Sequence, residues 1–308
     1  MRKHRLPPWV VLLCLAVICA ALIAGVAVWR SNRSSAAALV SRLPSDGGAI
    51  VLSVDFAALR KAGVLGLLNS SRVRQEPEYR SFVNQTGFDY LNDLDAALVS
   101  FHSTGTYFLL RGRFDWKNLK DYTVHQGGTC YNTFCRVAGS TPERKISYFP
   151  LQPGMMALAV SRDESAAMQL QTHRAGRKFN IPDDPVWSLI PMAALKNSGQ
   201  LPPGTRAFAR LLADADTVVI SAAVEDGRIG LRMDASCRSA AGAKTLAAQL
   251  TDATALLRNL IARENKAPNA SDLSGVLAAG AFENRDTHVL GRWPLDRAFL
   301  ENLAGNSL

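Results

Sequence analysis

The stretch Thr217–Ala235 reads TVVISAAVEDGRIGLRMDA, and it is the part of the chain that decides the fold class. Two runs rich in β-branched and apolar residues flank the tripeptide Glu-Asp-Gly at 225–227. An Asp-Gly pair between two such runs is a strong signal of a tight hairpin turn. The pattern predicts two antiparallel strands, Thr217–Val224 and Arg228–Ala235.

A long helix is expected directly after this hairpin, over Ser239–Glu264. Apolar residues recur in it at helical spacing, and they are Leu246, Leu250, Ala253, Leu257, Leu260 and Ile261. Ser239 can cap the first turn, and Pro268 lies beyond the last one. We expect this stripe to pack on the core of the protein; docking of a partner helix is the alternative.

Short phrases of the chain occur twice, in the same order. The pairs are Phe56–Gly63 with Met192–Gly199, Asp95–Ser100 with Asp216–Ser221, and Phe149–Leu151 with Trp293–Leu295. Such repetition predicts an internal duplication. The alternative is chance agreement in a chain rich in Ala and Leu.

The remaining elements follow from apolar periodicity and turn residues. Further strands are expected at Ala49–Val54, Ala96–Phe101, Thr106–Phe114, Cys135–Ala138, Lys145–Phe149, Met155–Val160, Val186–Ile190, Val276–Phe282 and His288–Trp293. Further helices are expected at Phe56–Leu68, Asp115–Val124, Asp163–Arg174, 205–213 and Leu295–Leu303, with Asp115 as an N-cap. The predicted fold is α+β, with two similar halves of mainly antiparallel sheet and helices packed on one face. Whether the halves share one sheet is left open.

An apolar run precedes this domain. Trp9–Trp29 carries no charged residue over 21 positions, enough for a helix that crosses the ~30 Å hydrocarbon core of a bilayer. Trp at both ends suits the two membrane interfaces. A cleaved signal peptide is the alternative, because small residues at Ser35–Ala38 could form a cleavage site.

The basic residues near the run are almost evenly divided between its two sides, so they do not decide the orientation. We expect the N-terminus in the cytoplasm and the domain outside it, in a bacterial inner membrane facing the periplasm, because an anchor of this kind normally leads a translocated domain. The predicted organisation is a basic tail (1–8), a transmembrane helix (9–29), a stalk (30–42), a first half (43–174), a linker (175–185) and a second half (186–308).

The formal charge of +9 is concentrated at the start of the chain. Without residues 1–33, the chain has 30 basic and 26 acidic residues, and no dense basic run with interleaved aromatics is present. Nucleic-acid binding therefore has little support.

Three cysteines lie outside the apolar run. Cys130 and Cys135 could form a small disulfide across a turn, which would fit an oxidising compartment; free thiols or a metal site are the alternatives. Their separation is wider than that of the usual redox or zinc pairs. Cys237 is expected to be buried.

The sequence carries no recognisable catalytic, cofactor or metal signature. No phosphate loop, dinucleotide fingerprint, HExxH or GxSxG motif is present, so we assign no catalytic, cofactor-binding or metal-binding residue. The histidines at 102, 125, 173 and 288 are scattered and are interpreted as surface or turn residues. The close carboxylate pairs Asp93/Asp95 and Asp183-Asp184 could do acid/base work, but they sit beside turn residues and are interpreted as turn or cap residues. Asp89, Asp93 and Asp95 resemble a calcium loop only in their acidity, since such a loop would need a glycine at its sixth position and a final glutamate.

The order of basic tail, single anchor helix, Leu43-Pro-Ser-Asp46, strand and Asp55-Phe-Ala-Ala-Leu59 resembles uncharacterised bacterial membrane-anchored proteins with a duplicated α+β extracytoplasmic domain. The resemblance is structural and implies no active site. It implies an extracytoplasmic protein.

Three functions are compatible with these features. The first is a non-enzymatic module that binds an envelope protein or another envelope component. The second is a carrier of a lipid or other apolar ligand held between sheet and helices. The third is a hydrolase whose nucleophile and base come together only in space.

Overall fold

The computed structural model describes residues 36–46, 48–68, 76–173, 181–195, 210–212, 214–225, 228–263, 269, 271–296 and 298–299. The predicted transmembrane helix at 9–29 lies outside these residues, as do most of the helices predicted at 205–213 and Leu295–Leu303. Within the described ranges, no helix combines the length and the apolar character needed to span a membrane.

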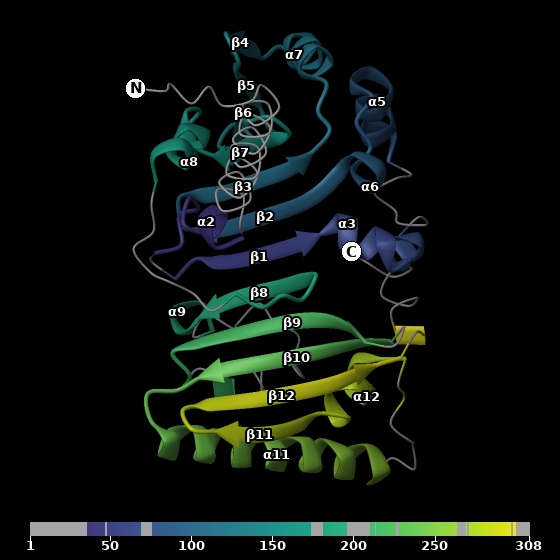
Figure 1. Cartoon of the computed structure of the whole chain (residues 1–308), viewed down its shortest axis with the longest axis vertical. Helices are drawn as coiled ribbons and strands as arrows, with labels where there is room; N and C mark the ends of the chain where they lie inside the picture. The colour runs from purple at the N-terminus through teal and green to yellow at the C-terminus, as the bar shows by residue number, and fades with distance from the viewer. Residues whose placement is uncertain are drawn as a thin grey trace, which may run out of the picture.

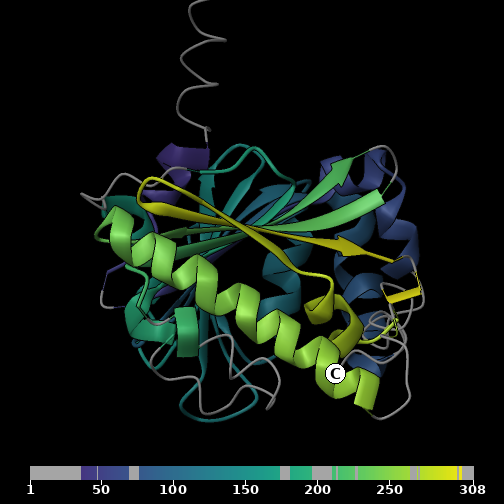
Figure 2. The same ribbon diagram turned by 90° about the horizontal axis from the view of Figure 1, so that it is seen from below.

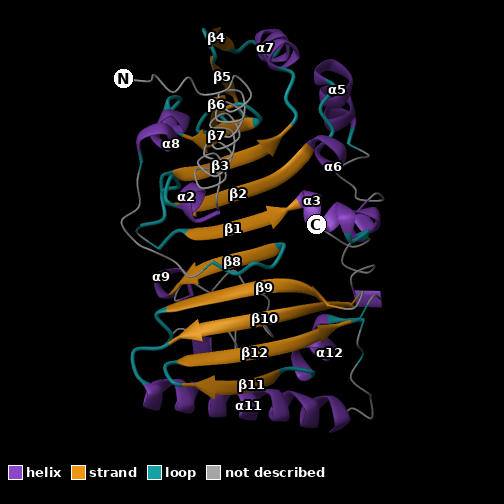
Figure 3. Ribbon diagram, viewed as in Figure 1, coloured by secondary structure: helices purple, strands orange, loops and turns teal. Residues whose placement is uncertain are grey.

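Twelve strands form one antiparallel sheet in the described part of the chain (Figures 1 and 3). The strands of the first half are β1 (Ile50–Asp55), β2 (Leu94–His102), β3 (Gly105–Gly112), β4 (Thr129–Tyr131), β5 (Phe134–Ala138), β6 (Lys145–Gln152) and β7 (Met155–Ser161). Those of the second half are β8 (Val186–Pro191), β9 (Thr217–Glu225), β10 (Arg228–Ser236), β11 (Ala281–Arg285) and β12 (His288–Leu295). The hairpin predicted from Thr217–Ala235 is confirmed as β9 and β10.

The helical elements are α2 (Ala36–Val40), α3 (Phe56–Lys61), η1 (Val64–Leu68), α5 (Pro77–Thr86), α6 (Tyr90–Asp93), α7 (Trp116–His125), η2 (Ala166–Met168), α8 (Gln169–Thr172), α9 (Met192–Leu195), α11 (Ala240–Arg263) and α12 (Leu273–Ala278). The long helix predicted after the hairpin is confirmed as α11. Asp115 caps α7 as predicted, because its side chain accepts hydrogen bonds from the backbone N–H groups of Lys117 and Asn118.

Both halves of the sheet have the same order of strands, read outward from the middle. The first half runs β1-β2-β3-β7-β6 and continues to β5 and β4, and the second runs β8-β9-β10-β12-β11. The halves meet where β1 pairs with β8, with Val51 opposite Leu189. The question left open by the sequence is thereby answered: the halves share one sheet.

Two of the three pairs of repeated phrases lie at equivalent places in the two halves, and the third pair does not. Phe56–Gly63 and Met192–Gly199 begin in the helices α3 and α9 that follow β1 and β8. The phrases at Asp95–Ser100 and Asp216–Ser221 lie in β2 and at the start of β9, which hold the same place in each half. The third pair does not correspond, because Phe149–Leu151 lies on the outer strand of its hairpin, β6, whereas Trp293–Leu295 lies on the inner strand, β12.

The sheet has two faces, named here after a helix that covers each. The α11 face packs against α3, α6, α7 and α11, as shown by the buried residues Leu59, Leu91, Leu119 and Leu250 in clusters with the strands. The opposite α2 face packs against α2, η2 and α8 through Val40, Ala166, Ala167 and Leu170. Figure 2 shows α2 and α11 on opposite sides of the sheet.

The prediction of helices on one face only is therefore wrong. In β7, Ala157 and Ala159 point to the α2 face and Met156 points to the α11 face, and all three are buried. A strand covered on both faces is apolar at successive positions rather than at alternate ones. That pattern was present in the sequence MMALAV at 155–160.

Several local predictions need correction. The segment Val276–Phe282 was expected as a strand, but Leu273–Ala278 is helix α12, because the Asp272 side chain caps it by accepting from the Gly275 N–H at 2.8 Å. The helix expected over Phe56–Leu68 is interrupted at Gly63, whose φ of 74° is the left-handed conformation that ends a helix. The helix expected over Asp163–Arg174 is reduced to η2 and α8.

Candidate ligand-binding face

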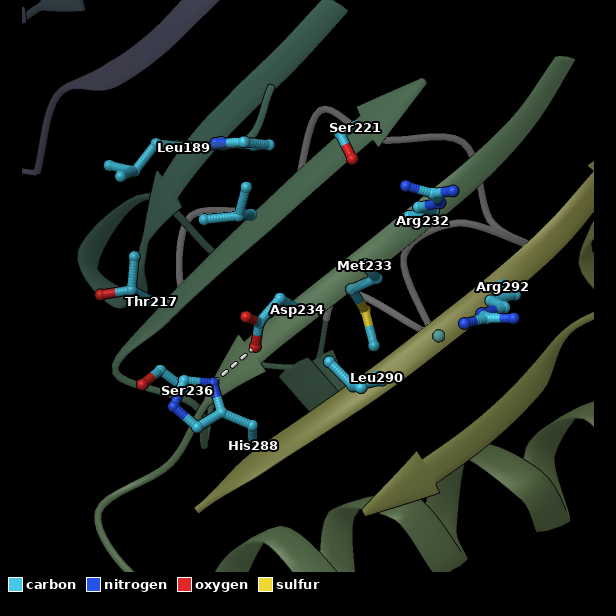
Figure 4. A pocket seen from close by; sticks show the side chains of 13 residues that line it. Leu189, Thr217, Ser221, Arg232, Met233, Asp234, Ser236, His288, Leu290 and Arg292 are labelled. Atoms are coloured by element: carbon cyan, nitrogen blue, oxygen red, sulfur yellow. Dashed lines mark hydrogen bonds and ion pairs between the residues drawn. The ribbon is translucent and has the colours of Figure 1, made fainter. Parts of the chain in front are cut away.

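The α2 face is uncovered over β9, β10 and β12 in the described part of the chain. A cavity of about 520 Å³ lies there, and Pro182 stands at its border. Its lining residues come from the four neighbouring strands β8, β9, β10 and β12, and polar and apolar side chains are mixed among them (Figure 4). This part of the α2 face is called the open face below.

The alternation of side chains along a strand creates the open face. Met233 and Ala235 of β10 are buried under α11, so the residues between and beside them point the other way. Arg232, Asp234 and Ser236 therefore line the cavity from β10. The paired residues of β12 follow the same rule: Arg292, Leu290 and His288 lie opposite them in the register.

An imidazole and a carboxylate meet on the open face. The Nδ1 atom of His288 lies 2.7 Å from Oδ1 of Asp234, and Figure 4 shows this contact as a dashed line. The two side chains are 44% and 39% exposed, so water screens their attraction. Ser236 is the direct strand partner of His288.

A second polar group lies beside the first, two residues away along β10 and on the adjoining strand β9. Asp184 accepts a hydrogen bond from Ser221 Oγ at 2.5 Å, and its other carboxylate oxygen lies 3.4 Å from Nη1 of Arg232. The carboxylate of Asp184 is only 16% exposed, whereas the guanidinium side chain of Arg232 is 42% exposed. Arg292 is exposed on the neighbouring strand.

The open face carries both signs of charge at close range. Arg232 and Arg292 supply guanidinium groups, and Asp184 and Asp234 supply carboxylates. Hydroxyl groups of Thr217, Ser221 and Ser236 add neutral donors and acceptors. Such a surface can hold a ligand that has both an anionic and a cationic group, since each finds an opposite charge.

Nucleophilic chemistry has less geometric support. A Ser, His and Asp occur together here, but among the described residues no hydrogen bond joins the Ser236 hydroxyl to the His288 ring. An activated serine needs its base within about 3.2 Å, although this distance is often longer without substrate. Among the described residues, the Asp234–His288 contact is therefore not extended to a serine hydroxyl.

Sequence reasoning missed the residues of the open face. His288 was interpreted as a surface or turn residue and is 44% exposed, and the Asp183-Asp184 pair lies in a bend before β8 as expected, but the sequence did not show that His288 and Asp184 belong to the polar groups of one face. A signal was present in the alternation of polar residues at 232, 234 and 236 and at 288 and 292. Solvent-exposed sheet faces alternate in the same way, so the signal alone does not indicate a site.

The other sequence-selected residues lie elsewhere. Cys130 and Cys135 face each other on β4 and β5 and form a disulfide, with a sulfur–sulfur distance of 2.04 Å. Cys237 is a free, buried thiol, and its pKa is raised by burial and by the carboxylates of Asp216 and Asp214. In the described ranges, no three His, Cys, Asp or Glu side chains gather as metal ligands would.

The acidic residues before β2 act in local structure. Asp89 caps α6 and accepts a 2.7 Å hydrogen bond from the Tyr79 hydroxyl. Asp93 pairs with Arg113 at 2.9 Å, and Asp95 lies 3.8 Å from Arg60. His102 lies at a turn, where Nδ1 is 2.8 Å from Oγ1 of Thr104. His125 is exposed at the end of α7.

No model of a known protein family matches the chain. No curated protein matches it either. Among solved structures, the chain is similar to crystal forms I, III and IV of TP0453, a Treponema protein. Form IV gives a TM-score of 0.45 at 10% identity and covers 84% of this chain and 92% of that one. Form III gives 0.48 at 9% identity, with 84% and 93% covered.

Proposed function

We propose that this protein is a membrane-anchored, extracytoplasmic binding module that holds an envelope component on its open face. The Trp9–Trp29 segment would anchor it by one helix, with the N-terminus in the cytoplasm and the domain in the periplasm. The disulfide between Cys130 and Cys135 fits that oxidising compartment. The proposal assigns no enzymatic activity.

The observation that carries the proposal is the contrast along the α2 face. Over the first half, α2, η2 and α8 bury the apolar side chains of the strands, among them Tyr107 and Ala157. Over the second half, the same face presents charged and hydroxyl side chains around a cavity of about 520 Å³. Known ligand pockets have volumes of about 300–1,000 Å³ with a few placed polar groups.

We propose further that the two halves arose by duplication. The shared strand order and the phrases at Asp95–Ser100 and Asp216–Ser221 support it. Under this proposal, the first half has gained a second layer on its α2 face. The second half has kept that face for binding.

A lipid carrier is the second candidate. The interface between α11 and the sheet offers it little space, because Leu246, Leu250, Val218 and Val289 are all at most 2% exposed there. An apolar ligand would instead have to use the open face, where Leu189, Val219 and Leu290 lie among the polar groups. This candidate therefore places its ligand at the same site as the first.

Photo-crosslinking in intact membranes tests the proposed function. A benzoylphenylalanine replaces Leu290 on the open face of the full-length protein, and a matched variant carries it at Leu256, which is 60% exposed on α11. We expect one discrete adduct from position 290 that weakens when Arg232 is changed to Ala. Identical adducts from both positions, or none from position 290, would contradict the proposal.

A further inference from the structure

The attachment of the chain determines which face of the sheet is nearest the membrane. Helix α2 begins at Ala36, seven residues after Trp29. Whatever its conformation, a seven-residue segment spans at most about 25 Å. Since Val40 of α2 is buried on the α2 face, the anchor proposed above would join the domain on that face, and the short connection would favour placing it toward the bilayer.

The open face belongs to the same surface as the attachment point. Val40 and Leu189 are members of one buried cluster, and Leu189 also lines the cavity. Figure 2 shows α2 and α11 on opposite sides of the sheet, so the proposed anchor would leave α11 on the side away from the bilayer. In that arrangement the cavity would face the membrane surface.

The chemistry of the open face matches one kind of group at that surface. Guanidinium groups such as those of Arg232 and Arg292 bind phosphate oxygens through charge-assisted, often bidentate, hydrogen bonds. The carboxylates of Asp184 and Asp234 can accept from a primary ammonium group, which has three donors. Leu290 and Val219 offer apolar contact to the carbon atoms between the two charges.

We infer that the open face binds the zwitterionic headgroup of an aminophospholipid in the membrane to which the chain is anchored. The headgroup combines a phosphate and a primary ammonium, so it uses both signs of charge on β9, β10 and β12. This inference rests on the proposed function and names its ligand class.

Lipid selectivity of the full-length protein in detergent tests the inference. Native mass spectrometry measures binding of phosphatidylethanolamine, phosphatidylglycerol and phosphatidylcholine at equal concentration. We expect phosphatidylethanolamine to bind about tenfold more tightly than the other two, as expected from one charge-assisted contact. Phosphatidylglycerol binding equal to or tighter than that of phosphatidylethanolamine would overturn the inference.

Matched variants locate the bound lipid. Arg292→Gln should weaken phosphatidylethanolamine binding about tenfold, because a guanidinium–phosphate contact is lost. Arg263→Gln removes an exposed cation at the end of α11, outside the open face, and should leave binding unchanged. Equal loss in both variants would overturn the inference, since it would indicate a non-specific charge effect.

A soluble headgroup separates membrane lipid from a free metabolite. We expect glycerophosphoethanolamine to compete with the lipid only at concentrations at least about a hundredfold higher, because it lacks the effective concentration that the anchor provides at a membrane. This arm uses the full-length protein in bilayer nanodiscs. If the soluble headgroup competed at the same concentration as the lipid, a membrane lipid would be excluded as the source of the ligand.

A protein adduct at position 290 without lipid binding would overturn this inference and leave the proposed function standing.

Discussion

Strands β2 and β9 occupy the same place in the two halves, yet their surroundings differ. In β2, Leu98 and Ser100 on the α2 face are buried, at 5% and 0% exposure. In β9, Val219 on the same face is only half-buried and lines the cavity, together with Ser221, which is 6% exposed. The strand order is thus the same in both halves, whereas the second layer is supplied only where α2, η2 and α8 lie.

This difference shows that one sheet can serve two purposes. The first half buries both faces and gains stability from each of them. The second half depends on the packing of α11, whose Leu246 and Leu250 fill the cluster beneath β9, β10 and β12. In the described part of the chain, its other face carries no second layer of helices, and we propose that this face serves ligand contacts.

The largest expected effect is on the free energy of unfolding, and it distinguishes two leucine variants on the α2 face. Leu98→Ala removes a buried side chain under the second layer and should lower the free energy of unfolding by about 3 kcal/mol. Leu290→Ala, on the open face, should cost less than about 1 kcal/mol. Urea unfolding of the full-length protein in detergent measures both. Equal losses would break the comparison of the two halves.

The next largest effect on stability is expected from the removal of buried hydroxyl groups. Thr123 Oγ1 lies 2.5 Å from the Tyr148 hydroxyl, so Thr123→Val should destabilise the protein by about 1–2 kcal/mol. Thr254 Oγ1 is buried in α11 with no hydrogen-bond partner among the described residues. Thr254→Val should therefore be neutral, or stabilise by up to about 1 kcal/mol. The midpoints of thermal unfolding compare the two variants, and destabilisation by Thr254→Val would contradict this account.

Two carboxylates give a smaller, pH-dependent effect. The pKa of Asp272 is lowered by hydrogen bonds from Ser274 and the Gly275 N–H, and the pKa of Asp163 is lowered by hydrogen bonds from Ser165. A lowered pKa contributes stability above the unfolded value, near pH 4, and loses it as the pH falls toward the folded value. Asp272→Ala should cost about 1 kcal/mol at pH 7 and less at pH 3. Urea unfolding at both pH values measures this loss of stability. The same loss at pH 3 and pH 7 would show that the ionised carboxylate of Asp272 is not what stabilises the helix start.

The smallest effect concerns the rate of a modification. Burial, Asp216 and Asp214 raise the pKa of the Cys237 thiol, so its thiolate fraction at pH 8 is small. We expect iodoacetamide to alkylate Cys237 several-fold more slowly than a cysteine in an unstructured peptide, with the rate rising at higher pH. Mass spectrometry of the peptides measures this. Rapid alkylation at pH 8 would show that Cys237 is reached by solvent.

The sequence predicted the fold best where local signals agree. The Asp-Gly turn and its flanking strands predicted β9 and β10 within one residue, and the stripe through Leu246 and Leu250 predicted α11. The helix α5 was missed, although Pro77 stands at its start and Gly87 at its end. The second layer on the α2 face was predicted only in part: the helix expected over Asp163–Arg174 contains η2 and α8, but its place on the second face of the sheet was not predicted, and α2 is too short for helical periodicity to show it.

The open face was beyond sequence reasoning for a different reason. Asp184 and Arg232 are separated by 48 positions in the chain, and Asp234 and His288 by 54. Only the strand register brings them together, and one step of register moves every side chain to the other face. No local pattern encodes that register.

The pairing of β1 with β8 has a mechanical consequence. Backbone pairs from Val51 to Val54 join the halves, and Asp55 N–H donates to the Pro185 carbonyl at 2.7 Å beside them. Two-lobed receptors capture ligands by rotating about a hinge, but a continuous sheet offers no such hinge at this seam. The ligand capture proposed for β9, β10 and β12 would therefore proceed by adjustment of side chains, so empty and occupied forms should superimpose along the whole sheet.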